Sequence, residues 1–222
     1  MKIMPIGQSG YVVKTKNSEI VIDPYLSDSV FKASGKERMI PVTIDPKGIK
    51  CDAVICTHDH LDHLDPDTVI EIDENQFYIT TAEGVEKLKS LGRSNSRYLP
   101  LGESIDIGDF KITAVFALHS CEAMGVIVEA EGKKLYFSGD TLFDERLFEI
   151  ANYKPDVTFI CINGKLGNMN VEEALITAKK IGAAINIPTH YDMFASNTEN
   201  PLLFTEKIDG SRVLEAGKEY EF

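Results

Sequence analysis

Short apolar segments of strand length recur along the chain and are separated by polar, glycine-containing turns. They are rich in Val, Ile, Tyr and Phe, which is typical of β-strands. Nine segments fit this description: 11–13, 19–22, 53–56, 77–80, 111–117, 125–130, 134–137, 157–162 and 183–187. The intervening EGKK at 131–134 predicts a hairpin turn.

Helical patterns stand between these strands at 65–72, 82–92, 141–153 and 170–182. The first begins with Asp65 as a predicted N-cap and Pro66 at the first helical position. The last has Asn170 as its N-cap and Gly182 just beyond its end. Many strands with a few helices between them predict a layered α/β fold with substantial hairpin content.

Two stretches resemble each other in layout. GYVVKTKNSEIVIDP runs strand, turn, strand and then Asp23, and GVIVEAEGKKLYFSGD runs strand, turn, strand and then Asp140. This echo suggests two related half-domains that meet face to face.

Composition narrows the class of protein. The chain has 222 residues, 43% of them apolar, so we expect one large domain over 1–222 with a sizeable core. The apolar runs are too short for a membrane span, and the first residues lack the layout of a signal peptide, so we expect a cytoplasmic protein. The net charge of −12 disfavours nucleic acid as the main partner.

The four cysteines form no CxxC pair, and three of them stand in or beside apolar runs, where buried thiols are expected. Cys121 differs because it follows His119 by two positions.

Every histidine in the chain follows closely behind an apolar strand-like run. The five are His58, His60, His63, His119 and His190, and Asp140 stands in the same relation to its strand. Strand ends are where a rigid scaffold presents residues to a site. Any one of these features has an ordinary structural explanation, but their joint arrangement favours a metal centre.

The spacing within THDHLDHLDP separates two roles. His58 and His60 are two positions apart, so an extended backbone would point both to the same side. Asp62 and His63 follow a turn and can face a second point. Two metal ions need about six or seven protein ligands, and the five histidines with Asp62 and Asp140 supply seven.

At this point the motifs resemble a known family. HDHLDH is an instance of H-x-H-x-D-H, and with the later histidines and the Gly-Asp after a strand it resembles the metallo-β-lactamase superfamily over 23–190. That resemblance implies a four-layer αββα sandwich, two β-sheets flanked by helices, with metals at one edge. Within this superfamily, the chain resembles the branch containing ascorbate-6-phosphate lactonase in four segments: IDPYLSD, THDHLDHLDP, SGDT and IPTHYD.

The resemblance also implies a ligand set. His58, His60 and His119 would hold the first metal, Asp62, His63 and His190 the second, and Asp140 would bridge them. Asp23 would support a ligand rather than bind metal. Two divalent cations are implied: zinc by the superfamily, manganese by the lactonase branch, with iron as an alternative.

These features predict hydrolysis by a hydroxide that bridges two metal ions, with Asp140 orienting it and either Asp62 or the metals assisting proton transfer. The expected substrate is a small anionic ester or lactone, such as a sugar-phosphate lactone. Residues considered for substrate contact are Asn163, Lys165 and Tyr191, with Asp192, Gln8, Ser9, Lys36 and Arg38 as further candidates at the rim. Asp59, between two ligands, is expected to face away from the metals or to buttress one ligand.

Three alternatives stay open. A phosphodiesterase or nuclease could use the same site. A di-iron redox protein of this family would have glutamate where His60 stands, together with a flavin domain. A non-catalytic descendant would bind ligands through a decayed site. The sequence does not decide whether the chain forms a homo-oligomer.

Overall fold

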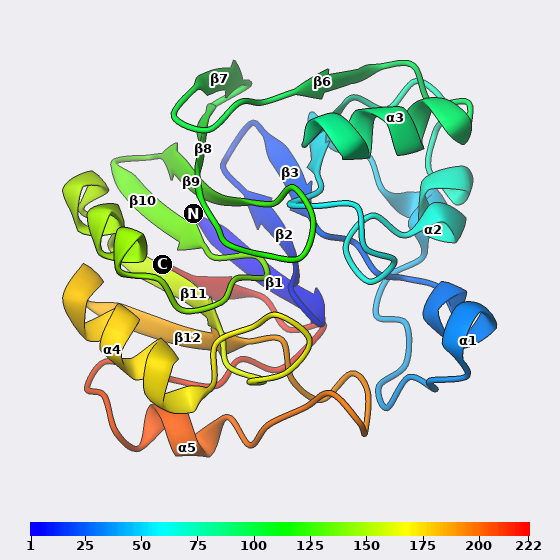
Figure 1. The fold of residues 1–222 in the computed structure, drawn as a ribbon. Helices are drawn as coiled ribbons and strands as arrows, with labels where there is room; N and C mark the ends of the chain where they lie inside the picture. Colours follow the sequence, from blue (N-terminus) through cyan, green and yellow to red (C-terminus); the bar gives the residue numbers. More distant parts are fainter.

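The computed structural model describes all residues, 1–222, as two β-sheets packed face to face with helices outside each sheet (Figure 1). The first sheet contains β1 (Lys2–Gly7), β2 (Gly10–Lys14), β3 (Glu19–Ile22), β4 (Ala53–Ile55), β5 (Tyr78–Thr80), β6 (Ser96–Tyr98) and β13 (Tyr220–Glu221). Its strand order is β13-β1-β2-β3-β4-β5-β6.

The second sheet contains β7 (Ser104–Ile107), β8 (Phe110–Phe116), β9 (Met124–Ala130), β10 (Lys133–Phe137), β11 (Val157–Cys161) and β12 (Ile185–Thr189). Its order is β12-β11-β10-β9-β8-β7. The helices of the first half are α1 (Ser29–Ser34), η1 (Pro46–Gly48), α2 (Pro66–Glu71) and α3 (Ala82–Ser90). Those of the second half are η2 (Glu145–Tyr153), α4 (Val171–Ile181) and α5 (Leu202–Thr205).

Three apolar layers hold these elements together. The largest, 23 buried residues, lies between the sheets, and two more of 15 and 12 residues pack helices onto the outer faces. In β3, Ile20 and Ile22 point into the inter-sheet layer while Val21 points to the helices, so the strand is apolar on both faces. The predicted four-layer αββα sandwich is confirmed.

All nine predicted strands are present, with ends shifted by a few residues, but β1, β6, β7 and β13 were missed. β1 carries a proline and a terminal glycine, β6 and β7 are largely exposed, and β13 has two residues. The edge strands β6, β7 and β13 show little hydrophobic contrast, and the proline and glycine of β1 interrupt its pattern, so the sequence did not reveal them.

The helix ends follow the predicted signals. The Asp65 side chain accepts a hydrogen bond from the Asp67 N–H and caps α2. Asn170 and Glu173 form a capping box at α4, and Gly182 ends that helix with a left-handed conformation. The segment 141–153 differs from the expected α-helix: only Glu145–Tyr153 is helical, and it is a 3₁₀ helix. Its buried residues Leu147 and Ile150 are three apart, which suits the 3₁₀ period.

The two halves share a topology. β1, β2 and β3 pair antiparallel and are followed by parallel β4 and β5, whereas β8, β9 and β10 pair antiparallel and are followed by parallel β11 and β12. The sequence echo between the segments ending at Asp23 and Asp140 therefore corresponds to equivalent hairpins in the two sheets. No helix has both the length and the apolar character needed to cross a bilayer.

Candidate metal centre

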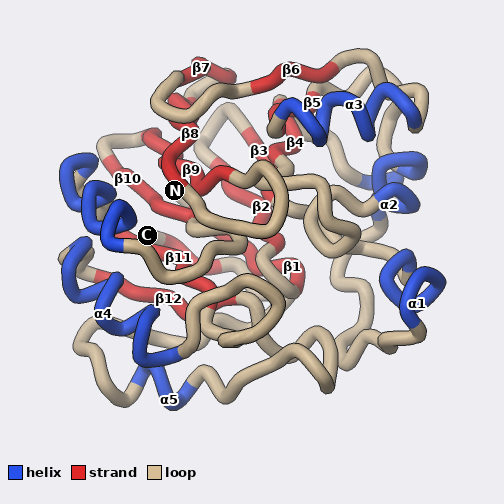
Figure 2. The backbone as a smooth tube through the Cα atoms, in the orientation of Figure 1, coloured by secondary structure: helices blue, strands red, loops and turns tan.

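Most predicted ligands lie at the carboxyl ends of strands that pair in parallel, whereas His119 follows β8, whose two neighbours are antiparallel. β4 leads into the loop with His58, β10 leads to Asp140 and β12 leads to His190. Figure 2 shows loops gathered between the two groups of helices, at the strand ends. Parallel strands of one sheet end at the same edge, so residues far apart in sequence arrive together.

Three imidazole nitrogens converge at a first point. His60 Nδ1 lies 3.1 Å from His58 Nε2 and 3.1 Å from His119 Nε2. Ring nitrogens at this separation can all bind one cation, because metal–nitrogen bonds are about 2.0–2.1 Å long. The residues around His58 and His60 form bends and not the extended backbone that we expected, but the two side chains do point to the same place.

A second point lies beside the first. Asp140 Oδ1 is 3.2 Å from His63 Nε2 and 3.1 Å from His190 Nε2. Asp62 Oδ2 is 3.6 Å from His190 Nε2 and 3.9 Å from His63 Nε2. The other oxygen of Asp140, Oδ2, lies 4.0 Å from His119 Nε2 at the first point, so this carboxylate faces both groups.

Two candidate ligands, His63 and His119, are held by contacts at their Nδ1 atoms. Asp23 accepts hydrogen bonds from Thr57 N at 2.7 Å and Thr57 Oγ1 at 2.8 Å, and its Oδ2 lies 2.8 Å from His63 Nδ1. His119 Nδ1 lies 3.0 Å from the carbonyl oxygen of Gly167. Contacts of this kind set which ring nitrogen is free to bind metal.

Backbone strain is concentrated around these residues. Seven non-glycine residues have φ between +43° and +63°, and five of them lie at or beside the ligands: Gln8, Asp23, Leu166, His190 and Asp192. Such conformations persist where the surrounding structure enforces them, and they cluster at functional sites.

The electrostatics differ between the two points. Burial lowers the pKa of His58 well below its usual value and also lowers that of His60. Both rings are therefore uncharged, and each can offer a nitrogen lone pair to a metal ion. Burial also opposes charge on His63, but neighbouring carboxylates, Asp140 foremost, outweigh it and raise the His63 pKa well above its usual value. Burial opposes charge on Asp140, but His190 and His63 outweigh it and hold the pKa of Asp140 well below its usual value.

The donor set fits divalent cations. His63 Nε2 and Asp140 Oδ1 are buried and have no hydrogen-bond partner. Buried polar atoms without partners are uncommon in native proteins, and cations between these groups would satisfy both. Three imidazoles with one facing carboxylate make up the first point, and two carboxylates with two imidazoles make up the second, which suits zinc, manganese or iron.

Comparison with known proteins agrees with this site. A family model described as a beta-lactamase superfamily domain matches residues 18–191. The chain belongs to the metallo-β-lactamase superfamily. A UPF0173 metal-dependent hydrolase of Alkaliphilus metalliredigens is 28% identical over 224 residues, covering 96% of this chain and 95% of that protein.

Solved structures of the superfamily share the fold. Igni18, described as a metallo hydrolase from the archaeon Ignicoccus hospitalis, is 26% identical with a TM-score of 0.79, covering 100% of this chain and 98% of that chain. An isothiocyanate hydrolase from Delia radicum gut bacteria is 20% identical with a TM-score of 0.83, covering 100% of this chain and 99% of that chain. At that identity, the second likeness shows the fold alone.

Within this metallo-β-lactamase fold, the residues considered for substrate contact have different surroundings. Asn163 is 1% exposed and its amide donates to Asn197 Oδ1 at 2.7 Å and to the Lys165 carbonyl oxygen at 3.2 Å. Its amide hydrogens therefore hold two loops together, which does not support the expected donation to a substrate. Lys165 is exposed on the same loop, two residues before the Gly167 that holds His119.

Other candidates at the rim are placed by their contacts. Tyr191 and Asp192 line a cavity of about 410 Å³ that Gln8 also borders. Arg38 packs over the Tyr25 ring and donates to the Tyr25 and Ser27 carbonyl oxygens at 3.1 and 2.9 Å, so it fastens its own loop.

Asp59 and Cys121 lie beside the first point. Asp59 is grouped with Glu83 and Cys121, and its backbone carbonyl accepts from Lys87. The Cys121 thiol can also be grouped with the three histidines of the first point. Burial foremost, together with nearby Asp59, raises the pKa of Cys121 to about 12, so the thiol is protonated.

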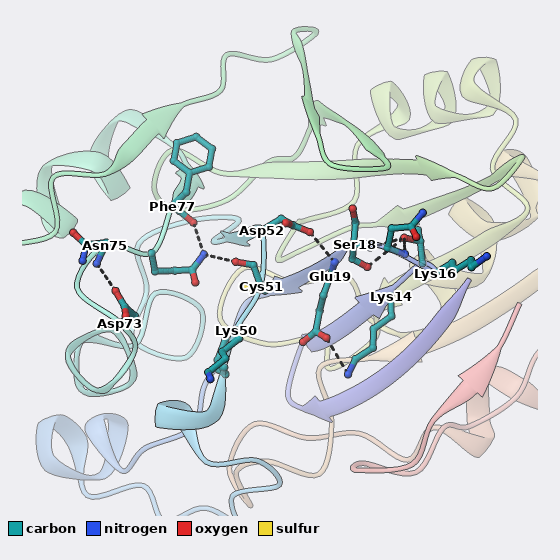
Figure 3. Close-up of a pocket in the computed structure, with 14 residues that line it drawn as sticks. Lys14, Lys16, Ser18, Glu19, Lys50, Cys51, Asp52, Asp73, Asn75 and Phe77 are labelled. Carbon is teal, nitrogen blue, oxygen red and sulfur yellow. Dashed lines mark hydrogen bonds and ion pairs between the residues drawn. The ribbon is translucent and has the colours of Figure 1, made fainter.

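A larger cavity of about 700 Å³ lies away from the metal centre (Figure 3). It is lined by the β2–β3 turn and by residues that precede β4 and β5, at the opposite ends of these strands from the ligands. Lys14 is paired with Glu19 at 3.0 Å, and Asp52 accepts from the Glu19 N–H at 2.9 Å. Some of the charges in this cavity therefore already have protein partners.

Sequence reasoning missed one contact of the centre. Gln8, considered only as a rim residue, lies against Asp62 and His190. The contact joins positions 54 and 182 residues apart, and no local spacing signals it.

Proposed function

We propose that this protein is a metal-dependent hydrolase with a dinuclear centre. The observation that carries the proposal is the convergence of seven donor side chains into two adjacent groups, with one carboxylate facing both. The relatives described as metal-dependent hydrolases support the same class of activity.

The residues would divide the work between the two points. His58, His60 and His119 would hold one cation, Asp62, His63 and His190 the other, and Asp140 would contact both. Zinc and manganese fit these donors, with iron as an alternative. Two such cations, when bound, polarise the substrate and generate a hydroxide nucleophile from water near neutral pH.

The protein groups provide orientation and proton transfer. Asp140, 6% exposed, would fix the geometry of the centre because its oxygens reach ligands of both points. Asp62 is 18% exposed and is thus the more accessible of the two carboxylates. It would accept the proton released from water and pass it toward solvent.

A small anionic ester or lactone is the substrate class that we propose. The argument rests on Lys165, which is exposed on the loop that holds His119 and can form a charge-assisted contact with a phosphate or carboxylate. In a protein with a net charge of −12, a centre with bound cations and this lysine would be a local positive region that attracts an anion.

A substrate screen tests the proposal. The protein would be stripped of metal, reconstituted separately with Mn²⁺ and Zn²⁺, and assayed on sugar-phosphate lactones, neutral lactones, carboxylic esters, an isothiocyanate and bis-nitrophenyl phosphate. We expect metal-dependent turnover that is highest on anionic lactones or esters and is lost in Asp62→Ala. Turnover confined to the phosphodiester would support the phosphodiesterase alternative. Full turnover and full metal content in Asp62→Ala would refute the mechanism.

A further inference from the structure

Gln8 follows β1 of the first sheet and lies against His190, which follows β12 of the second sheet. It follows Gly7 at the end of β1, is 6% exposed, and has a left-handed backbone with φ of +52°. Its carbonyl oxygen accepts from the His190 N–H at 3.2 Å and from Thr189 Oγ1 at 3.1 Å. The backbone of Gln8 is thus tied directly to the strand end that presents His190.

The end of the Gln8 side chain lies among the donor atoms of the second point. Its Nε2 atom is 2.6 Å from Asp62 Oδ2 and 3.1 Å from His190 Nε2. These are two of the atoms that would bind the second cation. The other polar atom of the amide, Oε1, is buried and has no partner.

The terminal amide can occupy this place in two orientations, because rotation by about 180° exchanges Nε2 and Oε1. With Nε2 toward Asp62, the amide donates to that carboxylate and points an N–H at His190 Nε2. With Oε1 there, the oxygen lies among the donor atoms, where a cation between them would bind it. The strained backbone of Gln8 holds the amide at this position in either orientation.

We propose that Gln8 is a further ligand of the second metal ion, through Oε1. This inference rests on the proposed dinuclear function. With Gln8, three of the five donor side chains at the second point bind through oxygen, whereas at the first point three of four bind through imidazole nitrogen. Oxygen-rich sites suit manganese, and nitrogen-rich sites suit zinc. Gln8 thus increases the difference between the two points, and the second point prefers Mn²⁺ more strongly than the first does.

Metal titrations of the wild type and variants test this ligand. Gln8→Met keeps the length of the side chain without a polar atom, and Gln8→Glu keeps an oxygen donor but cannot donate a hydrogen bond. Bound Mn²⁺ and Zn²⁺ would be counted by elemental analysis, and Mn²⁺ affinity followed by electron paramagnetic resonance. We expect Gln8→Met to lower the affinity for the second ion about 10–100-fold and to leave the affinity for the first unchanged. Gln8→Glu should bind the second ion at least as tightly as the wild type.

Two results would overturn the proposal. Gln8→Met could keep both ions at wild-type affinity, or Gln8→Glu could lose the second ion as readily as Gln8→Met does, as expected if Gln8 only donates to Asp62. If Gln8→Met does not fold, Gln8→Asn replaces it, because asparagine tolerates the left-handed backbone but is too short to reach. A wild type that binds a single ion would instead refute the dinuclear function, and Asp62→Ala serves as the reference for loss of the second point.

Discussion

The carboxylate of Asp23 lies 2.8 Å from Nδ1 of His63, and both side chains are buried. This contact leaves Nε2 of His63 as the nitrogen that faces Asp140 and the second metal point. Asp23 also binds the backbone N–H and the hydroxyl of Thr57, at the start of the ligand loop. One carboxylate thus fixes both the loop and the ring.

Replacing Asp23 by asparagine tests this role. The Asp23 carboxylate accepts three hydrogen bonds, and the NH2 group of asparagine cannot accept at least one of them. We therefore expect a loss of about 1–3 kcal/mol in the free energy of unfolding. The affinity for the second ion should fall about 10–100-fold because the His63 ring loses its orientation. Urea denaturation and metal titration measure the two effects. Unchanged affinity for both ions would show that Asp23 supports only the fold.

Asp65 provides a matched buried aspartate that supports a helix instead of a ligand. It accepts from Leu26 N, Ser27 Oγ and Thr68 Oγ1, and it caps α2. Asp65→Ala should lower the free energy of unfolding by about 2–3 kcal/mol through the lost cap and the unpaired donors. Once the variant is shown to be folded, its affinities for both metal ions should stay within about threefold of the wild type. The reason is that His63 contacts Asp23 and Asp140 and not Asp65. A selective loss of the second ion would instead tie α2 to the centre.

Gly167 is a second point of support, because a side chain there would meet the His119 ring. An added Cβ would lie 2.7 Å from both Cε1 and Nδ1 of His119, on a backbone with φ of +92°. We expect Gly167→Ala to lower the affinity for the first metal ion about tenfold and to leave the affinity for the second nearly unchanged.

Gly102→Ala is the control for Gly167→Ala. Gly102 has φ of +83° and no atom within 4 Å of the added Cβ, so this variant carries the backbone strain without the clash. It should cost about 1–2 kcal/mol of stability and leave both metal affinities unchanged. Equal metal loss in the two variants would mean that strain, and not the contact with His119, is responsible.

Lys165 is expected to act on the substrate and not on the metals. Lys165→Ala should raise KM for an anionic lactone or ester about tenfold, with kcat and metal content unchanged, because one charge-assisted contact is lost. Lys165→Arg should recover much of the affinity. Steady-state kinetics on an anionic substrate and its neutral analogue measure the effect, and an equal change on both would contradict a charge contact.

The sequence indicated the fold and the candidate metal ligands because both leave local traces. Strands buried on two faces are continuous apolar runs, and each candidate ligand follows such a run. The exposed strands β6 and β7 carry no such run, so they were missed. The 3₁₀ form of η2 was missed because a short apolar repeat fits either helix type.

The surroundings of the ligands were harder to predict, because they depend on contacts between distant segments. Asn163, a candidate donor to a substrate oxyanion, donates to Asn197 on another loop. Gln8 was expected at the rim, yet it reaches Asp62 and His190. Neither contact follows from spacing or periodicity, since each requires the two loops to be placed by the sheets first.

The most direct test of the dinuclear centre is a count of tightly bound divalent ions per chain in three proteins: wild type, His119→Ala and Asp62→Ala. Each would be saturated with Mn²⁺ or Zn²⁺, desalted and measured by elemental analysis against protein concentration. The two groups of donors predict two ions in the wild type and one in each variant, lost from the first point in His119→Ala and from the second in Asp62→Ala. One ion in the wild type, with the same count in Asp62→Ala, would contradict a second metal point and with it the proposed mechanism.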